Sequence, residues 1–266
     1  MVGVVGHRGC PSAAEVTQVG LDVGDLPQVA VDKGELSLRD LVGAVFDHSL
    51  KEAGLAPEVV VDGPRGDIGI IIGTTRPRRR GGMVAHWVRE VAEQHARTRG
   101  NDTTYELVDH ELPLLDETSP AIFGEYLGAH TRRWAETIGA CDGFVFVTPE
   151  YNHSTTAPLK NAIDYLFAEW NDKAAGFVSY GIHGGTRAVE HLRLILGELS
   201  VADVRTQVAL SMFTDFEISD PREPGTLAPS PHQEPTLTRM LDELGAWSRA
   251  LEPLRVPDAD DVSVAS

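Results

Sequence analysis

Four of the five residues from 76 to 80 are arginine, in a chain whose formal net charge is −17. They follow the apolar run Ile68–Ile72 and a turn that contains Thr74. A strand, a turn and a helix start of this kind form an anion site in α/β proteins, because backbone N–H groups point at the anion and arginine adds paired, charge-assisted hydrogen bonds. We therefore expect a phosphate on a small molecule here, contacted by the Thr74 hydroxyl and the guanidinium groups of Arg76 and Arg79.

The same segment leaves alternatives open. Arg78 and Arg80 either face solvent or meet a second phosphate, and the whole segment could be a solvated basic loop. The glycines on both sides of it favour close approach of a ligand to the backbone. Nucleic acid is a poor candidate, because a net-acidic surface repels a polyanion and no basic stripe recurs elsewhere in the chain.

A second polar turn, Pro149–Ser154, follows a strand expected at 143–148. Its Glu150 and Asn152 side chains can form hydrogen bonds, and Tyr151 offers an aromatic wall, so the turn suits the lining of a ring system. Taken alone, His153 fits a structural or surface histidine better than a general base. Glu150 equally fits a cap of the helix that follows.

A third turn, Gly181–Gly185, is rich in glycine and supplies backbone amides. Amides aimed at a ring carbonyl stabilise negative charge that develops there on reduction, as in an oxyanion hole. The alternative is a plain glycine-rich loop between a strand and a helix. The presence of the two other polar turns favours the binding function.

These turns need strands and helices that bring them together, and the chain alternates regularly between the two from Asp67 onward. Strands are predicted at 68–72, 105–109, 143–148, 175–180 and 205–210, and helices at 82–97, 121–138, 158–167, 188–199 and 236–251. This alternation predicts an α/β fold with a parallel sheet covered on both faces. In a doubly wound five-stranded sheet of order 2-1-3-4-5, the turns after strands one, three and four are neighbours and form one site.

The pattern also divides the chain. Residues 1–65 are rich in glycine and lack tryptophan and tyrosine, and we expect an extension of unknown role with one helix at 37–53. Residues 66–255 form the α/β domain. Residues 256–266 are expected to form a disordered acidic tail.

Composition narrows the class of protein further. No run approaches the length of about 18 apolar residues that a membrane span requires, and the N-terminus has no basic segment leading into an apolar one, so we expect neither a membrane anchor nor a signal peptide. The two cysteines, Cys10 and Cys141, lie far apart. They indicate a reducing cytoplasm, without a disulfide framework or a metal site.

Three motifs match a known family. The most specific is Pro-Glu-Tyr-Asn-His-Ser at 149–154, running into Leu-Lys-Asn-Ala-Ile-Asp at 159–164. The first turn matches as Gly-Thr-Thr-Arg-Pro-Arg-Arg at 73–79, and the third as Ser-Tyr-Gly at 179–181 with the glycine pair and Arg-Ala that follow. On these motifs the chain from Asp67 to Arg255 resembles the NADPH-dependent FMN reductase family of flavodoxin-like proteins, which includes quinone and azo-dye reductases.

The resemblance implies a flavodoxin-like sheet, here with an extra N-terminal segment, that binds FMN non-covalently. The phosphate would lie on the first turn, the ribityl chain and rings along the second, and the pyrimidine edge at the third. The residues implied to bind the cofactor are Thr74, Arg76, Arg79, Arg80, Gly81, Pro149, Glu150, Tyr151, Asn152, His153, Ser179, Tyr180, Gly181 and Gly184.

The implied activity is hydride transfer from NADPH or NADH through flavin N5 to a small electron acceptor such as a quinone or a flavin. The cofactor carries that chemistry, so no catalytic side chain is expected. Family members usually form homodimers or dimers of dimers. Two alternatives stay open: a dedicated biosynthetic flavoenzyme or a supplier of reduced flavin to a partner monooxygenase, and an electron carrier like a flavodoxin.

Two departures from the family pattern bear on specificity. Arg78 and Arg80 stand where the family usually has a small and an apolar residue, which favours a nicotinamide nucleotide with a 2′-phosphate. The third turn is one residue shorter than usual, with Ile182 and His183 filling it. This difference affects the expected pyrimidine contacts and the shape of the substrate pocket.

Overall fold

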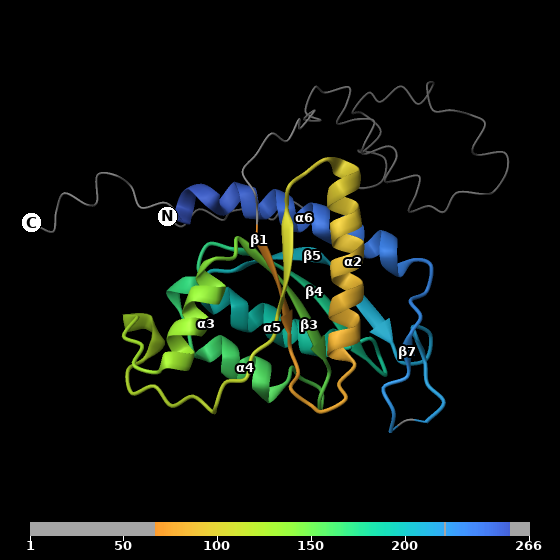
Figure 1. The fold of residues 1–266 in the computed structure, drawn as a ribbon, viewed down its shortest axis with the longest axis horizontal. Coiled ribbons are helices and arrows are strands. Elements are labelled where there is room, and N and C mark those ends of the chain that lie inside the picture. Colours follow the sequence, from red (N-terminus) through yellow and green to blue (C-terminus); the bar gives the residue numbers. More distant parts are fainter. Residues whose placement is uncertain (1–66, 221, 256–266) are drawn as a thin grey trace, which may run out of the picture. The chain divides into compact units, whose positions relative to one another are not determined.

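A computed structural model describes residues 67–220 and 222–255 of the chain. Five parallel strands form one sheet in the order β2-β1-β3-β4-β5 (Figure 1). Their bounds are Asp67–Ile72 for β1, Thr104–Val108 for β2, Gly143–Pro149 for β3, Ala174–Gly181 for β4 and Ala202–Ser211 for β5. The predicted α/β class, parallel pairing and strand order are confirmed.

Helices cover both faces of this sheet. Helices α2 (Gly81–Arg99) and α6 (Gln233–Arg255) pack on one face. Helices α3 (Ala129–Gly139), α4 (Ala157–Asp164) and α5 (Thr186–Glu198) pack on the other. Every connection between consecutive strands of this sheet contains a helix, as a parallel arrangement requires.

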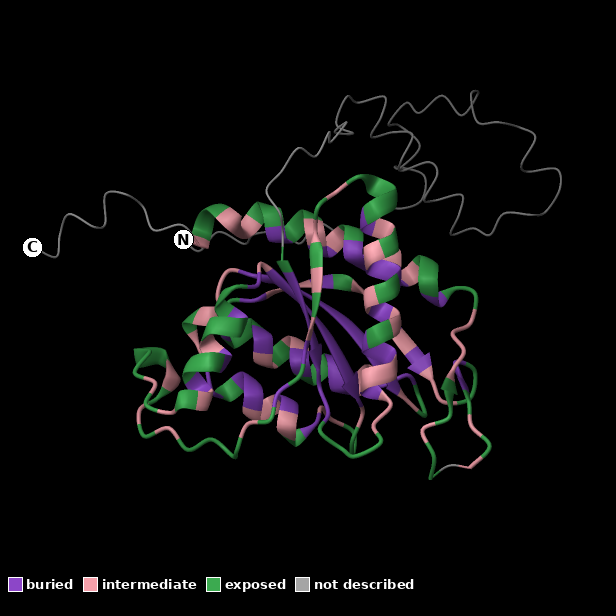
Figure 2. Ribbon diagram, viewed as in Figure 1, coloured by how far each residue is buried: buried purple, intermediate pink, exposed green. Residues whose placement is uncertain are grey.

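The central strands are apolar throughout because both of their faces are covered. In β3, Val145 and Val147 belong to the core under α2 and α6, while Phe144 and Phe146 belong to the core under α3, α4 and α5. Figure 2 shows the central strands buried along nearly their whole length. This rigid sheet fixes the positions of the turns at its carboxyl end.

The helix predicted at 121–138 is the main error. The structure has a short 3-10 turn, Ala121–Phe123, then an irregular stretch, and α3 begins only at Ala129. Gly124 adopts φ of 66° and ends the turn, a conformation that does not continue a helix. The Glu117 carboxylate accepts hydrogen bonds from the backbone N–H groups of Leu127 (2.9 Å) and Gly128 (2.8 Å), which stabilises the extended stretch before α3.

Smaller differences lie near the ends of elements. Helix α4 stops at Asp164, and a separate 3-10 turn, Ala168–Trp170, follows it. The segment between β5 and α6 contains two short strands, β6 (Phe216–Glu217) and β7 (Thr226–Leu227), which pair with each other. The helix predicted at 37–53, the extension 1–65 and the tail 256–266 lie outside the described residues.

The described residues bear on the expectations about membrane spans and metal sites. None of its helices combines the length and apolarity needed to cross a membrane. Within residues 67–220 and 222–255, no group of three or more His, Cys, Asp or Glu side chains could bind a metal ion.

Candidate functional site

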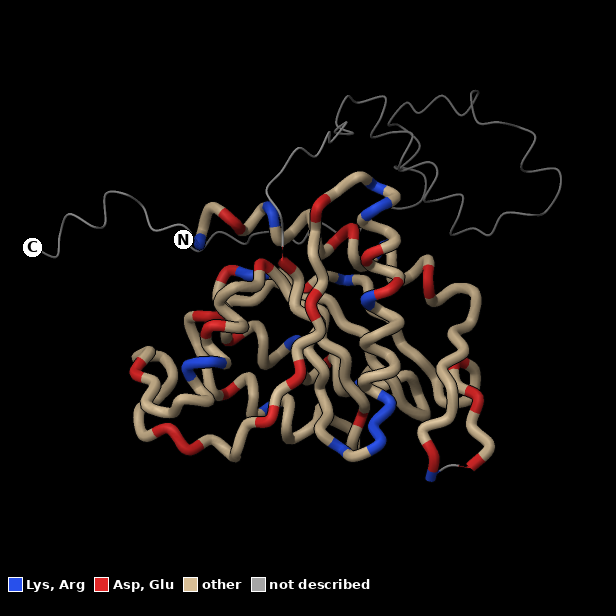
Figure 3. Tube along the Cα trace, viewed as in Figure 1, with Lys and Arg blue, Asp and Glu red and all other residues tan. Residues whose placement is uncertain are grey.

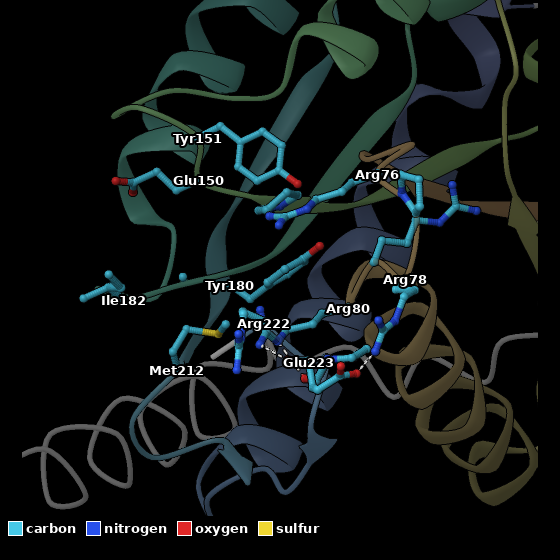
Figure 4. A pocket seen from close by; sticks show the side chains of 15 residues that line it. Arg76, Arg78, Arg80, Glu150, Tyr151, Tyr180, Ile182, Met212, Arg222 and Glu223 are labelled. Atoms are coloured by element: carbon cyan, nitrogen blue, oxygen red, sulfur yellow. Dashed lines mark hydrogen bonds and ion pairs between the residues drawn. The ribbon is translucent and has the colours of Figure 1, made fainter. Parts of the chain in front are cut away.

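The three polar turns meet at one cavity of about 400 Å³ at the carboxyl end of the sheet (Figure 4). A fourth segment, between β5 and α6, completes its wall. The cavity is lined by Arg76, Pro77, Arg78, Arg79, Arg80, Pro149, Glu150, Tyr151, Tyr180, Gly181, Ile182, Met212, Arg222, Glu223 and Pro224. The predicted convergence of the turns after β1, β3 and β4 is therefore what the fold produces.

The N-terminus of α2 borders this cavity, and no side chain of the described residues caps its backbone N–H groups. Its first residue is Gly81, its N-cap Arg80 makes no side-chain capping bond, and no acidic residue lies in the first turn. A Cβ at Gly81 would lie 2.8 Å from Thr74 Cγ2 and 3.1 Å from Tyr180 Oη, so the close packing requires glycine. Figure 3 shows the arginine run as a basic stretch at this helix end. The free amides and the helix dipole make the place favourable for an anion.

Thr74 is fully buried at the base of the first turn. Its hydroxyl lies 3.2 Å from the Tyr151 hydroxyl and accepts a hydrogen bond from the Arg76 amide at 3.4 Å. The first and second turns are thereby joined through side chains that were both predicted to belong to the site.

Of the four arginines, Arg79 has side-chain partners within the protein and Arg76 has none among the described residues. Arg79 donates from Nη1 to the Thr74 carbonyl at 2.9 Å and forms an ion pair with Asp109, at the end of β2. Arg76 is exposed, and its guanidinium makes no hydrogen bond or ion pair with any described residue. Arg76 is therefore the cation of this loop that is available to a ligand, while Arg79 is fixed in place.

Arg80 donates hydrogen bonds to the segment between β5 and α6. Its Nε donates to the Pro224 carbonyl at 2.7 Å and its Nη2 to the Glu223 carbonyl at 2.6 Å. Arg78 forms an ion pair with the Glu223 side chain. Both residues thus connect the first turn to the segment between β5 and α6, and the phosphate contact predicted for Arg80 stays a prediction.

The second turn is a tight hairpin of two residues. Tyr151 and Ser154 exchange backbone hydrogen bonds of 3.0 and 3.1 Å, and Asn152 and His153 adopt φ of 49° and 74°. Positive φ at both central residues is typical of a type I′ turn, which favours asparagine at the first of them. The geometry places the Tyr151 ring at the cavity wall.

Glu150 and His153 are both engaged by Arg187, from the first turn of α5. The Glu150 carboxylate forms an ion pair with the Arg187 guanidinium and accepts from its backbone N–H at 3.3 Å. Arg187 Nη1 lies 3.1 Å from His153 Nδ1. These contacts fix the second turn against the third and give neither side chain the freedom expected of a general acid or base.

The third turn depends on glycine at two positions. Gly184 and Gly185 adopt φ of 74° and 72°, and the Gly184 amide donates to the Gly181 carbonyl at 3.1 Å. Ser179 is buried and donates to the Gly184 carbonyl at 2.7 Å, so its hydroxyl shapes the turn from beneath. Burial raises the pKa of Tyr180, so its phenol is neutral at the cavity wall.

Comparison with known proteins identifies the family. The sequence model described as NADPH-dependent FMN reductase matches residues 67–215. An NAD(P)H-dependent FMN reductase of Schizosaccharomyces pombe is 34% identical over 192 residues, which cover 71% of this chain and 92% of that relative. This chain belongs to the NADPH-dependent FMN reductase family.

Other likenesses agree with this FMN reductase assignment. An NAD(P)H:quinone oxidoreductase of Solanum tuberosum is 52% identical over 88 residues, or 32% of this chain and 44% of that protein. A crystal structure of an oxidoreductase from Corynebacterium diphtheriae superimposes with a TM-score of 0.53 at 14% identity, over 70% of this chain and 98% of that one. At that identity the superposition shows the fold alone. The predicted family is confirmed.

Sequence reasoning missed several residues that build the site of this FMN reductase family member. Asp109 fixes a residue of the first turn, and Arg187, noted in the sequence only as part of the third motif, fixes residues of the second. Met212, Arg222, Glu223 and Pro224 form the fourth wall. The position of Asp109 at the end of strand two was a usable signal, since carboxyl ends of parallel strands share one edge. The segment from 222 to 224 gave no such signal, because its place depends on tertiary contacts with the first turn.

Proposed function

We propose that this protein is an FMN-dependent NAD(P)H oxidoreductase that passes a hydride to a small acceptor such as a quinone or a flavin. The observation that supports the proposal most directly is the meeting of an uncapped helix N-terminus, a free arginine and a glycine-rich turn around one cavity. The names of the relatives, which include FMN and quinone reductases, support the same activity.

The residues present fit an FMN. The cavity of about 400 Å³ falls in the range of small-molecule sites, which are about 300–1,000 Å³. Its cationic end, with Arg76 and the amides at Gly81, suits the phosphate. Tyr151, whose hydroxyl contacts Thr74 at 3.2 Å, offers an aromatic wall beside this end. Gly181 offers backbone groups for a flat ring system.

When bound, FMN supplies the two-electron chemistry at its N5. The protein's own contribution is orientation and electrostatics. Tyr151 and Pro149 would limit the position of the ring, and the amides of the third turn would stabilise negative charge at the pyrimidine edge. Glu150 acts through Arg187, by fixing the second turn against the third.

An anaerobic absorption spectrum of the purified protein tests the proposal. The expected result is a visible flavin band that is bleached in one step by NADPH or NADH. A flavin band that neither nucleotide changes would favour an electron carrier instead. A protein that carries no flavin and takes none up from added FMN would contradict the proposal altogether.

Glu150→Gln and His153→Ala are expected to lower kcat by less than roughly 100-fold, the lower range of general acid–base effects. The reason is that both side chains already bond to Arg187 and the flavin carries the chemistry. Steady-state rates at matched flavin content measure this, with the exposed Glu136→Gln as a control. A larger loss with flavin still bound would reveal a proton-transfer role.

The proposal includes a homodimer or tetramer in the cytoplasm. Large apolar side chains between β2 and α3 are more than half exposed, namely Leu114, Ile122, Phe123 and Leu127. Exposed apolar groups gathered in one segment are typical of an interaction surface. Sedimentation equilibrium measures the assembly state. The identity of the acceptor, including a flavin-using partner enzyme, is open to a screen of quinones, flavins and azo dyes.

A further inference from the structure

Arg78 lies at the rim of the cavity, beyond the part of the first turn that suits the FMN phosphate. It adopts φ of 58°, an uncommon conformation for arginine, and its side chain is 64% exposed. Its guanidinium pairs with the carboxylate of Glu223 (Figure 4). Because this arginine at the cavity rim already pairs with a carboxylate of the protein, its position favours an anion.

The position of Glu223 is built into the fold. Arg80 donates to the carbonyls of Glu223 and Pro224, at 2.6 and 2.7 Å, and so fixes the peptide that carries the carboxylate. Met83 Sδ contacts the amide of Leu227 at 3.1 Å, which adds a second attachment of the same segment to α2. The segment is therefore placed beside Arg78 by backbone contacts that do not involve the Glu223 side chain.

A second arginine lies on the same rim. Arg222 is 88% exposed and pairs with Asp220, with hydrogen bonds of 2.8, 3.0 and 3.2 Å. Both rim arginines thus form ion pairs with carboxylates of the protein at exposed positions. Exposed ion pairs contribute little stability, so an incoming phosphate, with more charge and more acceptor oxygens, can replace them.

We propose that Arg78 and Arg222 form the subsite for the 2′-phosphate of NADPH, and that Glu223 is an internal competitor that sets the preference for NADPH over NADH. This inference rests on the proposed function. FMN carries one phosphate, which the free Arg76 and the α2 N-terminus accommodate, so a further pair of arginines in the same cavity serves a second anion. The exposed rim suits the end of the dinucleotide that lies away from the reacting ring.

Two variants separate the parts of the subsite. Arg78→Ala removes the guanidinium, and Glu223→Gln removes the competing charge while keeping the backbone carbonyls that Arg80 contacts. Arg97→Ala, at the other end of α2, is the matched control, since it removes one exposed arginine from a place remote from the cavity. Flavin content is read from the absorbance of each FMN-saturated sample before any titration, and this reading tests the proposed function separately.

The experiment is calorimetric titration with adenosine 2′,5′-bisphosphate and with adenosine 5′-monophosphate, which differ by the 2′-phosphate. Arg78→Ala is expected to weaken binding of the bisphosphate by about 10-fold or more, the size of a lost charged hydrogen bond. Glu223→Gln is expected to tighten it by roughly 3-fold. The ratio of kcat/KM for NADPH over NADH is expected to move in the same directions.

Two results would overturn the subsite. One is an equal change for both adenosine ligands, which would assign the arginines to a group that NADH also carries. The other is unchanged affinity for the bisphosphate in Arg78→Ala, with the control behaving as wild type. Because the titration requires no turnover, it decides the question even where the flavin is not reduced by either nucleotide.

Discussion

Arg76→Ala is expected to weaken FMN binding by about 2 kcal/mol, or roughly 30-fold, the size of a lost hydrogen bond to a charged group. The reason is that the other three arginines of this turn already have partners within the protein. Arg79 is committed to Asp109 and to the Thr74 carbonyl, and the other two bond to the segment at 223–224. Arg76 alone of these four is without a partner among the described residues, so a ligand phosphate depends on it most.

The dissociation constant for FMN, measured by quenching of flavin fluorescence, checks this expectation. Arg76→Lys is the informative companion, because it keeps the charge and loses the planar fork. An intermediate affinity for the lysine variant would support paired hydrogen bonding. Unchanged affinity in Arg76→Ala would mean that the helix amides suffice and that Arg76 has another role.

Gly185→Ala is expected to destabilise the protein by about 3 kcal/mol, combining a left-handed backbone with steric overlap. Gly185 adopts φ of 72°. An added Cβ would lie 2.9 Å from the backbone N and O of Tyr180 and from Ser179 Cβ. The end of β4 must shift to accept it, and the Tyr180 wall of the cavity shifts with it.

Urea unfolding measures the change in the free energy of unfolding. Gly197→Ala is the matched control: Gly197 lies in α5, nothing lies within 4 Å of its added Cβ, and alanine favours a helix by up to about 1 kcal/mol. We expect the two variants to change stability in opposite directions. A Gly185→Ala protein as stable as the wild type would show that the third turn rearranges without cost.

The central part of the fold was predictable because its strands are buried on both faces. A run such as Ile68–Ile72 or Gly143–Val147 has few alternatives, and the alternation with helices fixes parallel pairing. The stretch from 121 to 128 was not predictable, since its backbone is stabilised by side chains from outside it, the Glu117 carboxylate and the Arg132 guanidinium. Apolar residues there suggested a helix but are largely exposed.

The site was predictable as three turns but not as a network. Residue types at Thr74, Tyr151 and Gly181 indicated a ligand, and the structure brings all three turns to one cavity. The sequence could not show which arginine lacks a partner, because that depends on the tertiary contacts of the other three arginines. Those partners come from β2, from α5 and from the segment before α6, at distances along the chain that no local pattern encodes.

The bond from Arg80 to Pro224 joins positions 144 residues apart, so the cavity exists only once most of the domain has folded. A ligand of this cavity therefore binds the native chain and leaves the unfolded chain alone. By mass action, a ligand at about 100 times its dissociation constant adds about 2.7 kcal/mol to the free energy of unfolding. Proteases act on the unfolded fraction, so we expect the ligand-bound protein to be degraded more slowly than the free protein.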